Sequence, residues 1–266
     1  MHNAAFAAAG IDAEYVLREV ERDEVDGAVA EARGPGWLGL GVTAPYKQVV
    51  AGLVDEVEPD ARSIGAVNNV VRQADGRLLG FNSDAPGFRA GVELALGRPL
   101  DDLEVVVVGA GGAAHAVVWA CLLAGVGRLT VATRREDSAT TLLARFAGQG
   151  RAARHACSLF DEQLSGALAT ADLAVNATTV GMVDPGSAFS VDALPSHATV
   201  FDLVYVPPET PLLAAARARG LRAANGSEML IQQAAIAFER WTGVGGVAGV
   251  MRDAVAPLLA DVAARA

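Results

Sequence analysis

Lysine is almost absent from this chain of 266 residues. Lys and Arg together number 21, and Lys47 is the one lysine among them. The two cations are nearly interchangeable on a solvated surface, but an ammonium can be desolvated and made to give up its proton, whereas a guanidinium cannot. The lone lysine is therefore a candidate for proton transfer, with chance retention as the alternative.

Cysteine, histidine and clustered basic residues are also scarce. The two cysteines, Cys121 and Cys157, argue against a disulfide framework and favour the reducing cytoplasm. The net charge is −10 and no basic cluster stands out, which argues against a nucleic-acid partner. The histidines lack the spacing of metal ligands, so we expect no metal; they are His2, His115, His155 and His197.

Formal charge is missing from one long stretch, the twenty-three residues from Val105 to Gly127. That length would suffice to span a membrane. However, Gly-Ala-Gly-Gly interrupts the stretch and charged residues flank it, which favours a buried strand, a turn and a buried helix. The first ten residues also lack the basic segment of a signal peptide. We therefore expect a soluble, cytoplasmic protein without a membrane partner.

The chain does contain a regular alternation of strand and helix patterns, typical of an α/β protein with mostly parallel strands. The pattern restarts as a βαβ unit near residue 100, which predicts two domains, 1–99 and 100–243. In the first of them we expect helices at 2–10, 23–32, 47–57 and 87–96, and strands at 14–20, 37–42, 66–73 and 77–84.

The second domain opens with Gly-x-Gly-x-x-Ala, placed after four valines and before an uncharged helix. Gly109 permits the tight turn, Gly111 lets the backbone approach a pyrophosphate, and the small Ala114 lets the helix pack on the strand. The free N–H groups of the helix N-terminus favour phosphate binding. Because strand, helix and next strand are all in place, the motif predicts a dinucleotide site. A glycine-rich turn without a ligand is the alternative.

The second strand of this unit bears on which dinucleotide binds. An NAD site usually ends that strand with Asp or Glu, which holds the ribose 2′-hydroxyl. Here the strand ends at Thr133 and is followed by Arg134 and Arg135, and two guanidiniums suit a 2′-phosphate. Glu136 and Asp137 come later, where a helix is expected to begin. We therefore expect NADP, with NAD less favoured.

Asp84 is a candidate partner for Lys47. It follows the second strand of the predicted hairpin and precedes a helix, where Asp commonly serves as a cap and nothing more. A dehydrogenase that reduces a ketone needs a proton donor beside the hydride acceptor, and a lysine held near a carboxylate is a workable acid–base pair. Sequence alone leaves both roles of Asp84 open.

Eight motifs in order resemble the shikimate dehydrogenase family over nearly the whole chain. They are HNAAF, GVTAPYK, GAVNN, GFNSD, GAGGAA, VNATTVGM, DLVYVPPETPLL and NGSEMLIQQAAIAFERWTG. The resemblance implies a reversible, NADP-linked reduction of 3-dehydroshikimate to shikimate in aromatic amino-acid synthesis. It also implies an N-terminal α/β substrate domain and a Rossmann-type, doubly wound NADP-binding domain, with the last helix (within 244–266) returning to the first domain. As partners we expect the small-molecule substrate and, in a homodimer, a second copy of the chain.

The same resemblance implies the site residues. Lys47 and Asp84 match the catalytic pair. The positions that match holders of the substrate's hydroxyls are Thr43, Asn68, Tyr205 and Gln233. The cofactor positions are Gly109, Ala110, Gly111, Gly112 and Ala113 at the pyrophosphate, Thr133 and Arg134 beside Arg135 at the 2′-phosphate, and Leu203, Gly226 and Met229 around the nicotinamide. By residue type alone, Asn68 and Tyr205 would be turn or core residues and Gln233 a solvated helix residue.

Departures from the family keep other functions open. The family's first strand and its Ser-x-Ser loop, which holds the substrate carboxylate, normally come just before HNAAF, and this sequence begins at Met1. Gly41, Thr133 and Val206 each stand where the family usually has Asn. The alternatives are a quinate/shikimate or aminoshikimate dehydrogenase of the same fold, or a non-catalytic dinucleotide-binding paralogue. An NAD-linked enzyme would be expected to carry an acidic residue near Thr133, where there is none.

Overall fold

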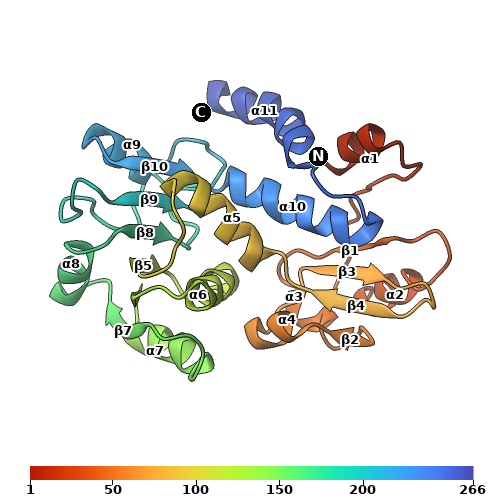
Figure 1. Cartoon of the computed structure of the whole chain (residues 1–266), viewed down its shortest axis with the longest axis horizontal. Coiled ribbons are helices and arrows are strands. Elements are labelled where there is room, and N and C mark those ends of the chain that lie inside the picture. The colour runs from red at the N-terminus through yellow and green to blue at the C-terminus, as the bar shows by residue number, and fades with distance from the viewer. Residues whose placement is uncertain (266) are drawn as a thin grey trace. The chain divides into compact units, whose positions relative to one another are not determined.

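The computed structural model describes residues 1–265 (Figure 1), and the chain divides into two compact units. The first unit comprises Met1–Pro86 and Ile231–Val255. The second comprises Gly87–Leu230 and the residues from Ala256 onward. The functional domains predicted at 1–99 and 100–243, with the last helix completing the first, stay a prediction.

The first unit contains a small mixed sheet with short helices. Its helices are α1 (His2–Ala9), α2 (Val25–Glu31), α3 (Lys47–Val50) and α4 (Pro59–Ile64), and its strands are β1 (Gly39–Gly41), β2 (Glu56–Val57), β3 (Asn69–Arg72) and β4 (Leu78–Phe81). Helix α5 (Asp84–Leu96) begins in this unit and continues into the second. Helix α10 (Ser227–Thr242) crosses from the second unit into the first, and α11 (Ala248–Arg265) crosses back.

The order of this sheet brings three chain segments to one end of it. The order is β1-β3-β4-β2, with β1 and β4 both antiparallel to β3 (Figure 1). Asn69 is paired with Gly41 on one side and with Phe81 on the other. The residues that follow β1, precede β3 and follow β4 therefore emerge together. These segments carry Lys47, Asn68 and Asp84.

The core beneath this sheet is aliphatic. It combines one face of α2 with residues from β3, β4 and the segments around them, namely Val25, Val29, Ala32, Val50, Ala61, Val67, Val70 and Leu78. A buried apolar face of this kind anchors the sheet, so the polar end described above is held by packing behind it.

Two predictions for the first unit were wrong. Residues 14–20 form no strand: a strand needs a neighbour's backbone groups, and the backbone of Tyr15 is bonded instead to the side chain of Asn3. The helix expected at 47–57 ends at Val50, and the chain then turns into the short strand β2, which pairs with β4. Helix α4, which follows β2, was not predicted.

The second unit is a parallel sheet with helices. Its strands are β5 (Glu104–Val108), β6 (Arg128–Thr133), β7 (Ala153–Ser158), β8 (Leu173–Asn176), β9 (Thr199–Asp202) and β10 (Arg222–Asn225). Its helices are α6 (Gly112–Ala124), α7 (Glu136–Arg145), α8 (Glu162–Leu168) and α9 (Pro211–Ala218). The strand order is β10-β9-β8-β5-β6-β7, and every pair is parallel.

Burial shows that both faces of this sheet are covered. All four valines of β5, Val105 to Val108, are buried although consecutive side chains point to opposite faces. The strand order is that of a doubly wound nucleotide-binding fold, so the predicted fold class is confirmed. The two edge strands, β7 and β10, consist mostly of half-buried or exposed residues, so they lack the apolar runs of the inner strands.

Across the part of the chain that the structure describes, no helix has the length and apolar character needed to cross a membrane.

Candidate active site

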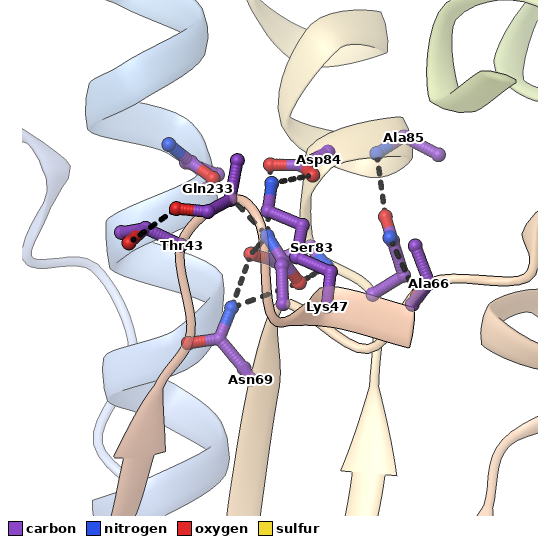
Figure 2. A network of polar contacts seen from close by, with 11 residues as sticks. Thr43, Lys47, Ala66, Asn69, Ser83, Asp84, Ala85 and Gln233 are labelled. Carbon is purple, nitrogen blue, oxygen red and sulfur yellow. Dashed lines mark hydrogen bonds and ion pairs between the residues drawn. The ribbon is translucent and has the colours of Figure 1, made fainter. Parts of the chain in front are cut away.

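Lys47 and Asp84 form an ion pair, although 37 positions separate them. The Lys47 Nζ lies 2.7 Å from Asp84 Oδ2. The side chain of Lys47 is 29% exposed and that of Asp84 is 9% exposed, so the carboxylate is nearly buried and the lysine side chain is partly exposed. Figure 2 shows the two side chains. Lys47 opens α3 and Asp84 opens α5, and the sheet brings both helix starts to one end. The two side chains considered as an acid–base pair are therefore in contact.

The amide of Asn68 completes the hydrogen bonding of that carboxylate. Its Nδ2 donates to Asp84 Oδ1 at 2.8 Å and to Gln233 Oε1 at 3.2 Å. One oxygen of Asp84 thus accepts from Lys47 and the other from Asn68. Charge-assisted bonds of this kind fix the carboxylate's position. Four of the predicted residues, which come from α3, the residue before β3, α5 and α10, are joined in one network.

A second ring of side chains holds Asn68, and sequence reasoning missed it. Asn68 Oδ1 accepts from the backbone N–H of Ser83 at 2.8 Å and from Asn69 Nδ2 at 3.0 Å. Asn69 Nδ2 also donates to Ser83 Oγ at 2.8 Å (Figure 2). Because Oδ1 is occupied by two donors, the Nδ2 of Asn68 is left facing Asp84. The only signal in the sequence was that these residues adjoin Asn68 and Asp84.

The start of α5 is capped by Asn82, not by Asp84. Asn82 Oδ1 accepts from the N–H of Ala85 at 3.2 Å, and its Nδ2 donates to the Ala66 carbonyl at 3.0 Å. An asparagine accepting from a first-turn N–H is a common helix cap. Asp84 is therefore not the cap of α5, since its carboxylate accepts hydrogen bonds from Lys47 and Asn68.

Two other predicted substrate residues differ in placement. Thr43 is exposed on the loop between β1 and α3, and Figure 2 shows it on the segment that leads to Lys47. Its hydroxyl lies 3.4 Å from the Ala44 carbonyl, a weak contact. Tyr205 follows β9 in the second unit and is half-buried. Their roles in binding stay predictions.

Packing explains why glycine is found at position 41. A Cβ at Gly41 would lie 2.6 Å from the hydroxyl of Tyr15, closer than real Cβ contacts come. The tyrosine hydroxyl therefore fills the space that a side chain at this position would need. Burial raises the pKa of this Tyr15 hydroxyl above its ordinary value. An asparagine at position 41 would therefore require the Tyr15 hydroxyl to move.

A pocket of about 440 Å³ in the second unit lies where the strand order of its sheet reverses. It is lined by the loops that follow β5, β8 and β9, through Gly109, Ala110, Gly111, Gly112, Ala113, Ala177, Thr178, Thr179, Met182, Leu203 and Val204. The predicted pyrophosphate loop and Leu203 are among these residues. Ala177, the two threonines, Met182 and Val204 were missed, although the motif VNATTVGM contains four of them.

The glycine loop leaves the space that a pyrophosphate requires. Gly109 has a φ of 120°, a conformation that disfavours any side chain, and a Cβ there would lie 2.9 Å from the Ala177 carbonyl. A Cβ at Gly111 or Gly112 would meet nothing within 4 Å. The loop is therefore tight on its inner side and open where it meets the N-terminus of α6, which fits a bound dinucleotide.

Gly226 and Met229 are not among the residues that line this pocket. A Cβ at Gly226 would lie 2.2 Å from the Leu203 carbonyl oxygen, so the glycine lets its segment approach the loop that carries Leu203. Met229 is buried, and its backbone N lies 2.8 Å from where Gly91 of α5 would carry a Cβ. The roles of Gly226 and Met229 at the nicotinamide stay predictions.

A buried network ties together two of the loops around this pocket. Asp202, fully buried at the end of β9, accepts from Asn176 Nδ2 at 2.8 Å, the Val204 N–H at 3.0 Å and the Thr210 hydroxyl at 2.7 Å. Burial raises the pKa of the Asp202 carboxyl. Asn176 also donates to the Val180 carbonyl. The network holds the loops after β8 and β9 together.

The segment predicted to meet the 2′-phosphate lies at a second pocket, also of about 440 Å³. Arg135 lines it, whereas Arg134 is exposed and lines neither pocket. Thr133 is nearly buried, and its hydroxyl donates to the Arg135 carbonyl at 2.5 Å. Within residues 1–265 there is no group of three or more His, Cys, Asp or Glu side chains that would hold a metal ion.

The fold and the site together define a class: a dinucleotide-binding α/β oxidoreductase with a lysine–aspartate pair. Comparison with known proteins identifies the family. Residues 1–70 match the shikimate dehydrogenase substrate binding domain, and residues 226–256 match the shikimate 5′-dehydrogenase C-terminal domain. The shikimate dehydrogenase (NADP(+)) of Symbiobacterium thermophilum is 42% identical over 259 residues, which cover 96% of this chain and 87% of the relative.

Two solved structures illustrate the range of the similarity. Shikimate 5-dehydrogenase from Thermus thermophilus, in complex with NADP(H) and shikimate, has a TM-score of 0.83 and 35% identity, covering 96% of this chain and 92% of the other. Quinate dehydrogenase from Corynebacterium glutamicum, in complex with NAD, has a TM-score of 0.86 and 36% identity with the same coverage. This chain belongs to the shikimate dehydrogenase family, as its motifs predicted.

Proposed function

We propose that this chain is an NADP-dependent oxidoreductase that reversibly reduces 3-dehydroshikimate to shikimate, a step of aromatic amino-acid synthesis. The observation that carries the proposal is the Lys47–Asp84 ion pair of 2.7 Å inside a network of amide side chains. The names of the similar proteins, shikimate dehydrogenase (NADP(+)) at about 40% identity, support the same reaction.

The residues of the first unit supply the proton and hold the substrate. Lys47 gives its proton to the oxygen of the C3 carbonyl in the direction of reduction and takes it back from the C3 hydroxyl in the direction of oxidation. Asp84 keeps the ammonium oriented by accepting one of its N–H groups. Asn68 and Gln233 would bind the remaining hydroxyls, with Thr43 and, from the second unit, Tyr205 as further candidates. The amide groups suit this task because each can both donate and accept.

The residues of the second unit would hold NADP. The N–H groups after Gly109 and at the start of α6 would bind the pyrophosphate, and the pocket beside Leu203 would take the nicotinamide. When bound, the reduced cofactor supplies the hydride that is added to C3. Asp202 and Asn176 would keep the loops around the nicotinamide in place by the hydrogen bonds described above.

A quinate dehydrogenase is the second candidate function, because such an enzyme with bound NAD is 36% identical over nearly the same length. Quinate differs from shikimate at the ring carbon that carries the carboxylate and at its neighbour. The C3 hydroxyl is common to both, so Lys47 would serve either substrate. The two candidates separate by substrate and cofactor together. Absence of a carboxylate at Thr133 favours the NADP-linked reaction.

The deciding experiment follows nicotinamide absorbance with shikimate or quinate as substrate and NADP or NAD as cofactor, four combinations in all. We expect the highest kcat/KM for shikimate with NADP. A preference for quinate with NAD would favour the second candidate. Binding of NADP without turnover of either substrate would favour a non-catalytic paralogue.

We also propose that the enzyme acts in the cytoplasm, supported by two cysteines that are buried and form no disulfide with each other. A homodimer remains our expectation for its assembly. Sedimentation equilibrium over a range of concentrations tests it, and a monomer at every concentration would refute it.

A further inference from the structure

The ring and backbone of Tyr15 are both held in place by neighbours in the first unit. The ring centroid lies 4.4 Å from that of His2 and 5.9 Å from that of Trp241, which stacks on it. The Tyr15 N–H donates to Asn3 Oδ1 at 2.6 Å, and the Tyr15 carbonyl accepts from Asn3 Nδ2 at 3.1 Å. A tyrosine held in this way presents its hydroxyl at one place, so little conformational freedom is lost when a ligand binds there.

The hydroxyl of Tyr15 points to the bare Cα of Gly41. A Cβ at that glycine would lie 2.6 Å from the hydroxyl oxygen and 3.9 Å from Asn69 Oδ1. Gly41 and Asn69 are paired across β1 and β3, and paired residues share one face of a sheet. The hydroxyl and the amide oxygen therefore flank one glycine, and its missing side chain leaves room for another molecule to approach both.

Neither of these two oxygens has a hydrogen-bond partner within residues 1–265. Asn69 uses its Nδ2 for Asn68 Oδ1 and Ser83 Oγ, and Figure 2 shows its oxygen pointing away from those contacts. The buried side-chain atoms that lack a partner in the described part of the chain do not include the Tyr15 hydroxyl or Asn69 Oδ1. Both atoms are therefore open to solvent and free to bind a ligand.

We propose that the Tyr15 hydroxyl and Asn69 Oδ1 bind a ring hydroxyl of the substrate, which makes Tyr15 a specificity-determining residue. The inference rests on the proposed function. Asn69 bonds Asn68, whose amide donates to Asp84, so the new pair lies one side chain outside the network around the acid–base group. The hydroxyl that it binds is not the one on C3, which Lys47 serves.

The chemistry of the pair selects a hydroxyl over a carboxylate. A hydroxyl can accept from Tyr15 and donate to Asn69 Oδ1 at the same time. An ionised carboxylate has no proton to donate, so Asn69 Oδ1 would repel it. The sequence does not indicate this role for Tyr15, because it depends on the ring contacts and on the pairing of β1 with β3.

Tyr15→Phe tests the proposal, since it removes the hydroxyl and keeps the ring. The substrates, each with NADP, are shikimate, its methyl ester and the two analogues that lack the C4 or the C5 hydroxyl. The readout is the ratio of kcat/KM between wild type and variant. With shikimate and with the ester we expect a loss of about threefold to tenfold, the net contribution of one hydrogen bond. One of the two deoxy analogues should show no loss, because the hydroxyl that Tyr15 binds is already missing from it.

His2→Phe is the matched control, because it changes the ring that packs on Tyr15 and leaves the hydroxyl in place. Any change in kcat/KM that it causes should be the same for all four substrates. A dependence on the substrate that matches that of Tyr15→Phe would show that ring packing, and not the hydroxyl, is responsible.

Gly41→Ala tests the placement of the hydroxyl without turnover. In the wild type the new Cβ would lie 2.6 Å from the hydroxyl oxygen, so Tyr15 must move and Tm should fall by at least about 2 °C. In the Tyr15→Phe background the nearest ring atom, Cζ, would lie 3.6 Å away, an ordinary contact. The same substitution should therefore lower Tm less in that background.

Two results with an active wild type would overturn the inference alone: a loss in Tyr15→Phe that is equal for every substrate, or a loss that vanishes with the methyl ester. An equal fall in Tm for Gly41→Ala in both backgrounds would also overturn it. No turnover of shikimate by the wild type would overturn the proposed function, and this inference with it. The two failures are therefore distinguishable.

Discussion

Substituting Gly226 by alanine should move the loop against which the nicotinamide is proposed to bind. A Cβ at this position lies 2.2 Å from the Leu203 carbonyl oxygen and 2.8 Å from its carbonyl carbon, whereas real Cβ atoms essentially never come within 3.0 Å of such neighbours. The two segments must therefore separate by at least 0.8 Å, the difference between 3.0 and 2.2. Both are backbone, so no side-chain rotation can relieve the contact.

The magnitude follows from what resists that separation. Leu203 donates to the Asn176 carbonyl at 2.9 Å, and Gly226 donates to the Val204 carbonyl at 3.3 Å. Overpacking of this kind costs about 1–3 kcal/mol. The smaller conformational entropy of an unfolded chain with alanine offsets about 0.4–1 kcal/mol of it. We expect a net loss of about 1–2 kcal/mol, or roughly 2–8 °C in Tm.

The kcat/KM for NADP should suffer more than stability, because a displacement of about 1 Å in a catalytic site can cost up to about 10²-fold in rate. Thermal unfolding followed by circular dichroism and the KM for NADP are measured on the same preparation. The control is Gly166→Ala in α8, where a Cβ meets nothing within 4 Å, and it should stabilise the protein by up to about 1 kcal/mol. A Gly226→Ala variant with the Tm and KM of the wild type would show that the contact with the Leu203 carbonyl does not constrain this loop.

Three further predictions concern buried polar groups. Burial lowers the pKa of His2 to about 4, so at pH 5 the folded state keeps the imidazole neutral while the unfolded state, with a pKa of about 6.5, binds a proton. The free energy of unfolding should therefore be about 2 kcal/mol lower at pH 5 than above pH 6.5. Urea titrations of the wild type should show this loss, and those of His2→Phe should not. The pKa of Asp202 is raised, so the wild type should gain stability relative to Asp202→Asn as the pH falls through that raised value; a pH-independent difference between the two would contradict the assignment. Ser83→Ala removes an acceptor shared by Asn68 and Asn69 and should cost about 1–3 kcal/mol, whereas Ser83→Thr should retain the bond and the activity.

The sequence was most informative where local pattern and chemistry coincide. Four valines followed by a glycine turn could be interpreted as a strand and a phosphate-binding helix, because each part depends only on neighbours in the chain. The lone lysine likewise stood out by composition. Its partner Asp84 could be suggested but not placed, since their contact depends on how β1, β3 and β4 pair.

The sequence-based predictions were wrong or incomplete where contacts between residues distant in the sequence determine the structure. Residues 14–20 have a strand-like composition, but no ladder forms there and Asn3 bonds the backbone of Tyr15 instead. The ring of Asn69 and Ser83 around Asn68 depends on side-chain directions that sequence spacing does not give. Arg145 lines the same pocket as Arg135, ten residues earlier, because of the way α7 faces, and no motif records this.

The substitution Lys47→Arg tests whether Lys47 is the acid–base group of an NADP-linked dehydrogenase. The variant keeps a cation that can pair with Asp84 but cannot release a proton. We would measure kcat for oxidation of shikimate together with NADP affinity. We expect turnover by the wild type, a loss of about 10²-fold or more in the variant and an NADP affinity close to that of the wild type. A variant that retains most of its kcat would show that Lys47 does not transfer the proton.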